Sequence, residues 1–177
     1  MLTVLVGGAR SGKSALAEQL AREHHSDVTY IATCPRIAGD AELADRIARH
    51  RSVRPAAWVT IEEEVDLAGA IREAGNAMVI IDCLTTWVGN LRHHGMTADE
   101  VISASAEALA AARHRTQATI VVSNEVGLGI VPSDQSTREY RDLLGQVNRA
   151  WVAGADRALF LVAGRALALH DPLELLR

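Results

Sequence analysis

The sequence predicts an α/β fold in which a central, mostly parallel sheet is flanked by helices. Three observations lead to this prediction. Short apolar runs alternate with amphipathic stretches along the 177 residues. Several of these runs are apolar throughout, which is typical of parallel strands covered on both faces. A glycine-rich turn from Gly7 to Ser14 joins the first apolar run to the first helical pattern.

The elements follow in an order that suits such a sheet. Short apolar runs predict strands at residues 2–6, 28–32, 58–61, 77–81 and 118–122. Apolar residues at helical spacing predict helices over residues 13–23, 40–50, 65–74, 85–94, 97–114 and 133–153. Gly75 and Gly95 interrupt the helical patterns, and Thr97 with Glu100 has the spacing of a capping box. Residues 158–162 and 166–170 predict a C-terminal hairpin around Gly164.

Composition and length limit the class of protein. Apolar residues make up 49% of the chain, charged residues 23%, and the net charge is −4. We expect one globular domain over residues 1–177 and no broad binding of nucleic acid. No apolar run reaches the roughly 18 residues of a membrane span, and the first strand starts directly after Met1. Cys34 and Cys83 make neither a disulfide framework nor a metal quartet, so a reduced, cytoplasmic setting is expected.

The turn after the first strand is a phosphate-binding loop by its pattern, G-x-x-x-x-G-K-S. It reads Gly7-Gly8-Ala9-Arg10-Ser11-Gly12-Lys13-Ser14. The glycines let successive N–H groups turn toward phosphate oxygens, and the next helix presents its positive end to the same anion. Lys13 is expected to meet the β- and γ-phosphates, and the Ser14 hydroxyl to bind Mg²⁺. The alternative is a plain glycine-rich turn between a strand and a helix, and the occurrence of strand, loop, Lys-Ser pair and helix in this order disfavours it.

Carboxylates at two strand ends are further candidates. Asp82 ends the run Val79-Ile80-Ile81, where proteins with a phosphate-binding loop hold the metal or its water. Glu62, Glu63 and Glu64 follow the strand at 58–61, and a carboxylate just after a strand could bind ribose hydroxyls or a base edge. The alternative for each is a solvated carboxylate.

A cluster of arginines surrounds His50. Arg46, Arg49, Arg51 and Arg54 flank it, and His50 lies near the stripe of its helix that faces the body of the domain. Neighbouring cations favour the neutral, nucleophilic form of the ring and could neutralise phosphates. The alternative is a helix C-terminus carrying cations that favour the helix dipole. A later loop, residues 123–132, is polar and then glycine-rich and apolar, where an acceptor substrate could lie.

These stretches together resemble the bifunctional adenosylcobinamide kinase/adenosylcobinamide-phosphate guanylyltransferase family of cobalamin biosynthesis. The matching residues run in order across nearly the whole chain, at 7–14, 30–33, 46–55, Trp58 with Thr60 and Glu62, 82–85, and 123–132. Some members of the family carry two adjacent histidines where this chain has Arg49 and His50. The resemblance therefore implies His50 alone as the nucleophile.

The resemblance implies a RecA-like fold with a phosphate-binding loop (P-loop), a trimer and two reactions. First, a nucleoside triphosphate phosphorylates the hydroxyl of the corrinoid adenosylcobinamide. Second, GTP guanylylates His50, and the GMP passes to adenosylcobinamide phosphate. GTP and ATP are the implied substrates, with Mg²⁺ held by Ser14 and Asp82. The implied nucleotide contacts, besides the loop and Lys13, are Ala32, Thr33, Cys34, Arg51, Ser52, Val53, Arg54, Glu62, Asp82 and Leu84.

Two other functions are compatible with the phosphate-binding loop. One is a simpler small-molecule kinase in which His50 only ends a helix. The other is a nucleotide-dependent switch or motor that binds a partner protein or DNA, although the acidic balance disfavours DNA.

Overall fold

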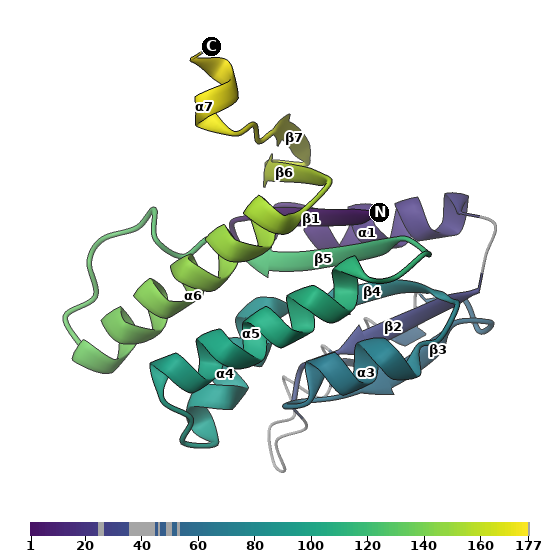
Figure 1. Ribbon diagram of the computed structural model, residues 1–177, viewed down its shortest axis with the longest axis horizontal. Helices are drawn as coiled ribbons and strands as arrows, with labels where there is room; N and C mark the ends of the chain where they lie inside the picture. The colour runs from purple at the N-terminus through teal and green to yellow at the C-terminus, as the bar shows by residue number, and fades with distance from the viewer. Residues whose placement is uncertain (25–26, 36–44, 46, 49–50, 53, 177) are drawn as a thin grey trace.

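The computed structural model of the chain describes residues 1–24, 27–35, 45, 47–48, 51–52 and 54–176 (Figure 1). Its strands are β1 (Leu2–Gly7), β2 (Val28–Ala32), β3 (Val59–Glu62), β4 (Met78–Asp82), β5 (Thr119–Asn124), β6 (Arg157–Val162) and β7 (Arg165–Ala168). They form one sheet in the order β3-β2-β4-β5-β1-β6-β7. All neighbours pair in parallel except β6 and β7, which form the antiparallel C-terminal hairpin. The predicted α/β fold with a mostly parallel sheet is confirmed.

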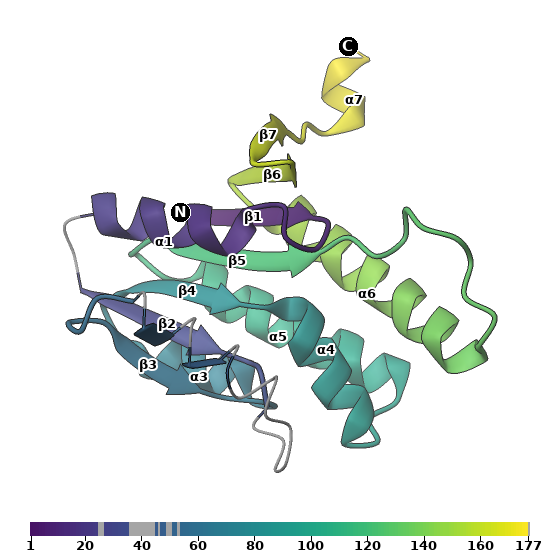
Figure 2. The ribbon, with the colours of Figure 1, turned by 180° about the vertical axis from the view of Figure 1, so that it is seen from behind.

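Helices cover both faces of this sheet. They are α1 (Lys13–Glu23), α3 (Leu67–Glu73), α4 (Leu84–His93), α5 (Ala98–Arg113) and α6 (Gln135–Gly154), whereas the short α7 (Pro172–Leu175) lies beyond the C-terminal hairpin (Figures 1 and 2). Figures 1 and 2, taken from opposite sides, show α1 on one face and α3 to α6 on the other. No helix in the described ranges is long and apolar enough to cross a membrane.

Alternating strand residues supply the two cores. In β1, Val4 and Val6 pack into the larger core with α3 to α6, whereas Leu5 packs with Ala17 and Ala21 of α1. The larger core also contains two buried tryptophans. Their indole N–H groups donate to the Val65 carbonyl and the Ser105 hydroxyl, so the buried polar atoms are satisfied.

Local signals set most element boundaries. The Thr97–Glu100 capping box is present, with the Thr97 side chain accepting from the Glu100 N–H. The last long helix starts at Gln135 rather than at the expected 133, because Asp134 is the residue whose side chain caps it. Strands β1 and β5 run past the expected ends, since Gly7 and Asn124 still pair. The short helix α7, which Asp171 caps, was not predicted from the sequence.

The helix expected at 40–50 falls largely outside the described residues. Within that range only Asp45, Ile47 and Ala48 are described, and all three are helical. Arg51 and Ser52, just beyond it, are helical as well.

Candidate nucleotide-binding site

The carboxyl ends of five parallel strands meet at one edge of the sheet. Gly7 of β1 is level with Asn124 of β5, and Asp82 of β4 is level with Val122 of β5 and Ala32 of β2. Ala32 is in turn level with Glu62 of β3. Ligands of open α/β sheets bind beyond this edge. Residues widely separated in the sequence are thus brought to one place.

The phosphate-binding loop leaves this edge and enters α1. Gly12 has a φ of 100° and Arg10 a φ of 56°, so two residues of the loop adopt left-handed backbone conformations. Such conformations let a loop turn successive N–H groups to one side. The loop is also attached to the C-terminal hairpin, since the Gly164 N–H donates to the Ser11 carbonyl over 3.1 Å.

Lys13 is held inside its own loop. Its side chain is 5% exposed, and Nζ donates to the carbonyl oxygens of Gly7 at 2.9 Å and Gly8 at 2.6 Å, and to Ser11 Oγ at 3.3 Å. Burial lowers the pKa of Lys13, while the Asp82 carboxylate acts in the opposite direction. Lys13 is the only lysine in the chain. It lies next to Ser14, which is half-buried in the first turn of α1.

Asp82 ends β4 and is held by a tyrosine from the neighbouring strand. Tyr30 of β2 is 1% exposed, and its hydroxyl donates to Asp82 Oδ2 over 2.5 Å. Burial, followed by the charge of Asp82, raises the pKa of Tyr30 well above its ordinary value, so the ring keeps its proton. On the face of the same ring lies the Arg54 guanidinium, 3.5 Å from the ring centroid.

Thr33 fastens the backbone next to Asp82. Its side chain is completely buried, and Oγ1 donates to the Cys83 carbonyl at 2.8 Å and accepts from the Cys83 N–H at 2.9 Å. The Thr33 N–H also donates to the Asp82 carbonyl. Burial raises the pKa of the Cys83 thiol between these groups. Three hydrogen bonds therefore join the loops after β2 and β4 at the site.

The described part of the arginine cluster reaches the same edge. Arg51 forms an ion pair of 3.0 Å with Glu62 at the end of β3, and Arg54 lies on Tyr30. His50, the expected nucleophile, and Val53 lie outside the described residues. Ser52 is exposed and Cys34 half-buried.

Not every residue implied by the resemblance can face a ligand with its side chain. Leu84 is completely buried in the larger core, and the Thr33 side chain is occupied by Cys83. Leu84 would contact a nucleotide only through its backbone.

Tyr30, Thr85 and Ser123 lie in stretches that carry the family resemblance, but the sequence predicted no supporting role for their side chains. A buried tyrosine needs a partner for its hydroxyl, and this requirement was the one available signal for Tyr30. A second polar group joins β5, α4 and α6. The Ser123 hydroxyl donates to Asn148 Oδ1 at 2.6 Å, and the Thr85 hydroxyl accepts from the Asn124 N–H at 2.6 Å.

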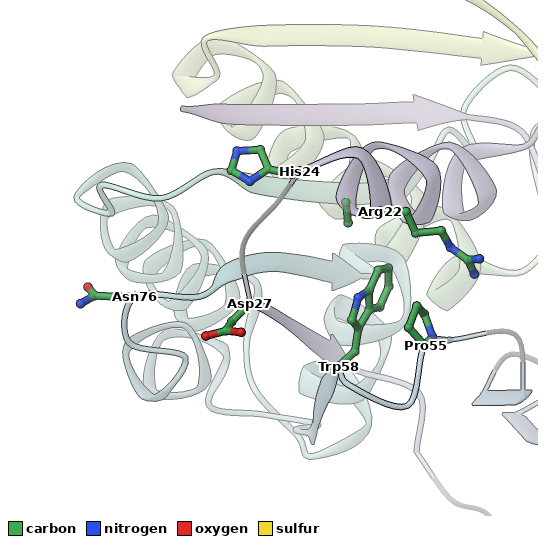
Figure 3. Close-up of a pocket in the computed structure, with 7 residues that line it drawn as sticks. Arg22, His24, Asp27, Pro55, Trp58 and Asn76 are labelled. Atoms are coloured by element: carbon green, nitrogen blue, oxygen red, sulfur yellow. The ribbon is translucent and has the colours of Figure 1, made fainter.

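A separate cavity of about 740 Å³ opens at the opposite edge of the sheet (Figure 3). Its lining includes the end of α1 and residues just before β2, β3 and β4, namely Ala21, Arg22, His24, Asp27, Pro55, Trp58 and Asn76. The Arg22 guanidinium lies 6.0 Å from the Trp58 ring centroid. None of these residues belongs to the phosphate-binding loop, and the cavity lies at the ends of the strands opposite to that loop.

The loop, its lysine and the strand-end aspartate on this sheet define the class of P-loop nucleotide-binding proteins with a RecA-like fold. The particular family follows from comparison with known sequences. The model of the cobinamide kinase / cobinamide phosphate guanyltransferase family matches residues 3–169. The chain belongs to this family, and it is a bifunctional enzyme of cobalamin biosynthesis.

Curated relatives agree with this assignment. The chain is 42% identical to the bifunctional adenosylcobalamin biosynthesis protein CobP of Pseudomonas aeruginosa, over 98% of this chain and 100% of that protein. It is 39% identical to the bifunctional adenosylcobalamin biosynthesis protein CobU of Escherichia coli K12, over 93% of this chain and 97% of that protein. The resemblance found in the sequence is confirmed.

Solved structures agree on the fold. An ATPase of a bacterial type III secretion system superposes with a TM-score of 0.56 at 14% identity, over 91% of this chain and 51% of that one. The RadB recombinase superposes with a TM-score of 0.51 at 16% identity, over 90% of this chain and 73% of that one.

Proposed function

We propose that a single domain, residues 1–177, catalyses two successive transfers to a corrinoid at one nucleotide site. In the first, a nucleoside triphosphate, ATP or GTP, phosphorylates the hydroxyl of adenosylcobinamide. In the second, GMP from GTP passes through His50 to adenosylcobinamide phosphate and gives adenosylcobinamide-GDP. The observation that carries the proposal is the phosphate-binding loop, with its buried Lys13, at the strand edge that ends in Asp82. Membership of the family supports both reactions.

The kinase step needs charge stabilisation around the γ-phosphate. The substrate hydroxyl oxygen forms the new bond to phosphorus, the bond from phosphorus to the β-phosphate oxygen breaks, and the hydroxyl proton leaves to solvent or a base. Lys13 Nζ now donates to loop carbonyls and would donate to phosphate oxygens instead. A fixed cation at that position stabilises the negative charge that develops on the leaving diphosphate.

The donor set at the site fits Mg²⁺. In the described part of the chain no three His, Cys, Asp or Glu side chains converge on a point, so no cage built only of protein ligands is found there. The Ser14 hydroxyl and the Asp82 carboxylate supply oxygen, and Mg²⁺ is usually held by one or two such groups together with substrate phosphates and water. When bound, the ion would neutralise phosphate charge. Ser14 would hold it directly, and Asp82 would hold it directly or through water.

The guanylyl transfer uses a nucleophile from the protein. A ring nitrogen of His50 attacks the α-phosphorus, the bond to the pyrophosphate oxygen breaks, and a phosphoramidate to GMP forms. A phosphate oxygen of adenosylcobinamide phosphate then attacks the same phosphorus, and His50 leaves. Arg51 and Arg54, which follow His50 in the chain, are attached to the site edge through Glu62 and Tyr30. This attachment supports delivery of His50 to a nucleotide bound there.

The test is a covalent adduct. Incubation with α-labelled GTP and Mg²⁺, followed by denaturation and intact-mass measurement, is expected to add one GMP to the wild type. The bond should survive alkali and break in acid. His50→Ala should lose the adduct and guanylyl transfer while largely keeping the kinase activity. His114→Ala, at the end of α5, is the control and should behave as wild type. An adduct that persists in His50→Ala would assign the nucleophile to another residue.

We also propose a homotrimer. Large apolar side chains are exposed on the C-terminal hairpin and on α7, among them Val162, Leu167, Leu173 and Leu175. Large exposed apolar side chains gathered on neighbouring elements favour a protein interface there. Light scattering coupled to size exclusion should give three times the mass of the 19.0 kDa chain. Asp substitutions at Leu167 and Leu173 should reduce it.

A further inference from the structure

A buried side chain joins the two halves of the site. Tyr30 contacts Asp82 through its hydroxyl and Arg54 through its ring face, over 2.5 Å and 3.5 Å respectively. Asp82 belongs to the edge that would serve the phosphates in both reactions. Arg54 belongs to the segment that follows His50. We propose that Tyr30 is a positioning residue that orients Asp82 and Arg54 together, an inference that rests on the proposed function.

The hydroxyl restricts Asp82. A carboxylate at a strand end can rotate freely unless one oxygen is bound. Here Oδ2 accepts a short hydrogen bond from a tyrosine that is 1% exposed, and the backbone of the same residue is bonded to Thr33. With the main chain and one carboxylate oxygen both fixed, the other oxygen, Oδ1, has a defined direction. A preorganised ligand binds a cation without first losing rotamer freedom.

The ring restricts Arg54. Its guanidinium carbon lies 3.5 Å from the ring centroid, and its Nε is buried without a hydrogen-bond partner in the described structure. The aromatic face is therefore the main contact that orients this group. Such a contact needs the planar guanidinium and the planar ring, so neither lysine nor an aliphatic side chain replaces it fully.

The two contacts can be removed separately. Tyr30→Phe keeps the ring and loses only the hydrogen bond to Asp82. Tyr30→Leu loses both contacts, and Arg54→Met loses only the guanidinium. The chain has one other tyrosine, Tyr140 of α6, whose hydroxyl donates to the Thr85 carbonyl over 2.8 Å. Tyr140→Phe therefore removes a hydroxyl hydrogen bond of ordinary length and is the matched control.

The first measurement does not need turnover. Titration calorimetry gives the affinity for GDP with and without Mg²⁺. In Tyr30→Phe the gain in GDP affinity caused by Mg²⁺ should fall about tenfold, as expected for losing a hydrogen bond to a charged group, and the affinity without Mg²⁺ should stay unchanged. Tyr140→Phe should match wild type in both. If Tyr30→Phe and Tyr140→Phe give the same gain, the hydroxyl does not position Asp82.

The second measurement is the ratio of the two activities. Tyr30→Phe should slow phosphorylation and GMP-adduct formation equally, so the ratio stays at the wild-type value. Tyr30→Leu and Arg54→Met should each lower the adduct rate by a further factor of about ten relative to phosphorylation. The double variant Tyr30→Leu/Arg54→Met should have the same ratio of adduct formation to phosphorylation as each single variant, because each single substitution already removes the contact between the ring and the guanidinium. If Arg54→Met leaves the ratio of adduct formation to phosphorylation unchanged, the Tyr30 ring does not position Arg54. This test does not need Tyr30→Leu, so it remains valid if that variant does not fold.

The outcomes separate this inference from the proposed function. If wild-type protein forms no GMP adduct and phosphorylates no corrinoid, the proposed function fails. The calorimetric comparison still tests the link between Tyr30 and Asp82 in that case. If the wild type has both activities and the Tyr30 variants match Tyr140→Phe, the inference alone fails.

Discussion

The backbone of Gly7 lies so close to Leu161 of the neighbouring strand that a methyl group on Gly7 would overlap the Leu161 carbonyl oxygen. The two residues are level in the parallel pair β1–β6. The first glycine of the phosphate-binding loop is thus needed by the sheet as well as by the loop. Nothing lies within 4 Å of the corresponding position on Gly8.

We therefore predict opposite consequences for two adjacent substitutions. Gly7→Ala should lower the free energy of unfolding by about 2 kcal/mol or more, because overpacking against backbone forces β1 and β6 apart. Gly8→Ala should change it by less than about 0.5 kcal/mol. Urea unfolding of the two variants measures both values. Equal free energies of unfolding for Gly7→Ala and Gly8→Ala would mean that β6 can shift away from β1 without loss of stability.

Lys13→Ala should lower the rates of both reactions about 100-fold or more, because each develops phosphate charge in the same loop. Since Lys13 is the only lysine, isotope-labelled lysine gives one side-chain NMR signal. That signal should shift when Mg²⁺ and GTP are added. Addition of Mg²⁺ and ATP should shift it as well if the site binds ATP. If Lys13→Ala kept one of the two reactions at the wild-type rate, the two reactions would use different phosphate-binding sites.

Two buried threonines should respond differently to the same change. Thr33→Val removes both hydrogen bonds to the Cys83 backbone and should cost about 2 kcal/mol of folding free energy, together with slower turnover. Thr119 is equally buried, but its hydroxyl has no hydrogen-bond partner in the described structure. Thr119→Val should therefore be neutral or stabilising by up to about 1 kcal/mol. Chemical denaturation measures the free energy of unfolding of both variants. A clear loss of stability in Thr119→Val would mean that the Thr119 hydroxyl does have a hydrogen-bond partner.

The capping box of α5 should make stability depend on pH. Hydrogen bonds from Thr97 lower the pKa of Glu100 below its ordinary value. A carboxyl whose pKa is lower in the folded state stabilises the fold above its unfolded pKa and loses this effect as the pH falls through its folded pKa. Glu100→Ala should therefore lower the melting temperature at pH 7, and by less near pH 3. A difference independent of pH would mean that charge plays no part in the cap.

Much of the fold was predictable because its signals are local. The phosphate-binding loop, the strand-end Asp82 and the Thr97–Glu100 box each depend on residues within a few positions of one another. The sheet and its hairpin followed from apolar runs and one glycine turn. The short α7 was missed, because a single turn capped by Asp171 has too few residues to show a helical period.

The sequence by itself determined the class of fold, the place of the G-x-x-x-x-G-K-S pattern between the first strand and the first helix, and the family. Only the tertiary structure decided which residues support the candidate site. Tyr30 and Asp82 are 52 positions apart, and they meet because β2 and β4 are neighbours in a parallel register that puts Ala32 level with Asp82. Gly7 meets Leu161 for the same reason in β1 and β6. No short turn connects either pair of parallel strands, so their register follows from how the apolar faces of the whole sheet pack and not from the residues of one turn.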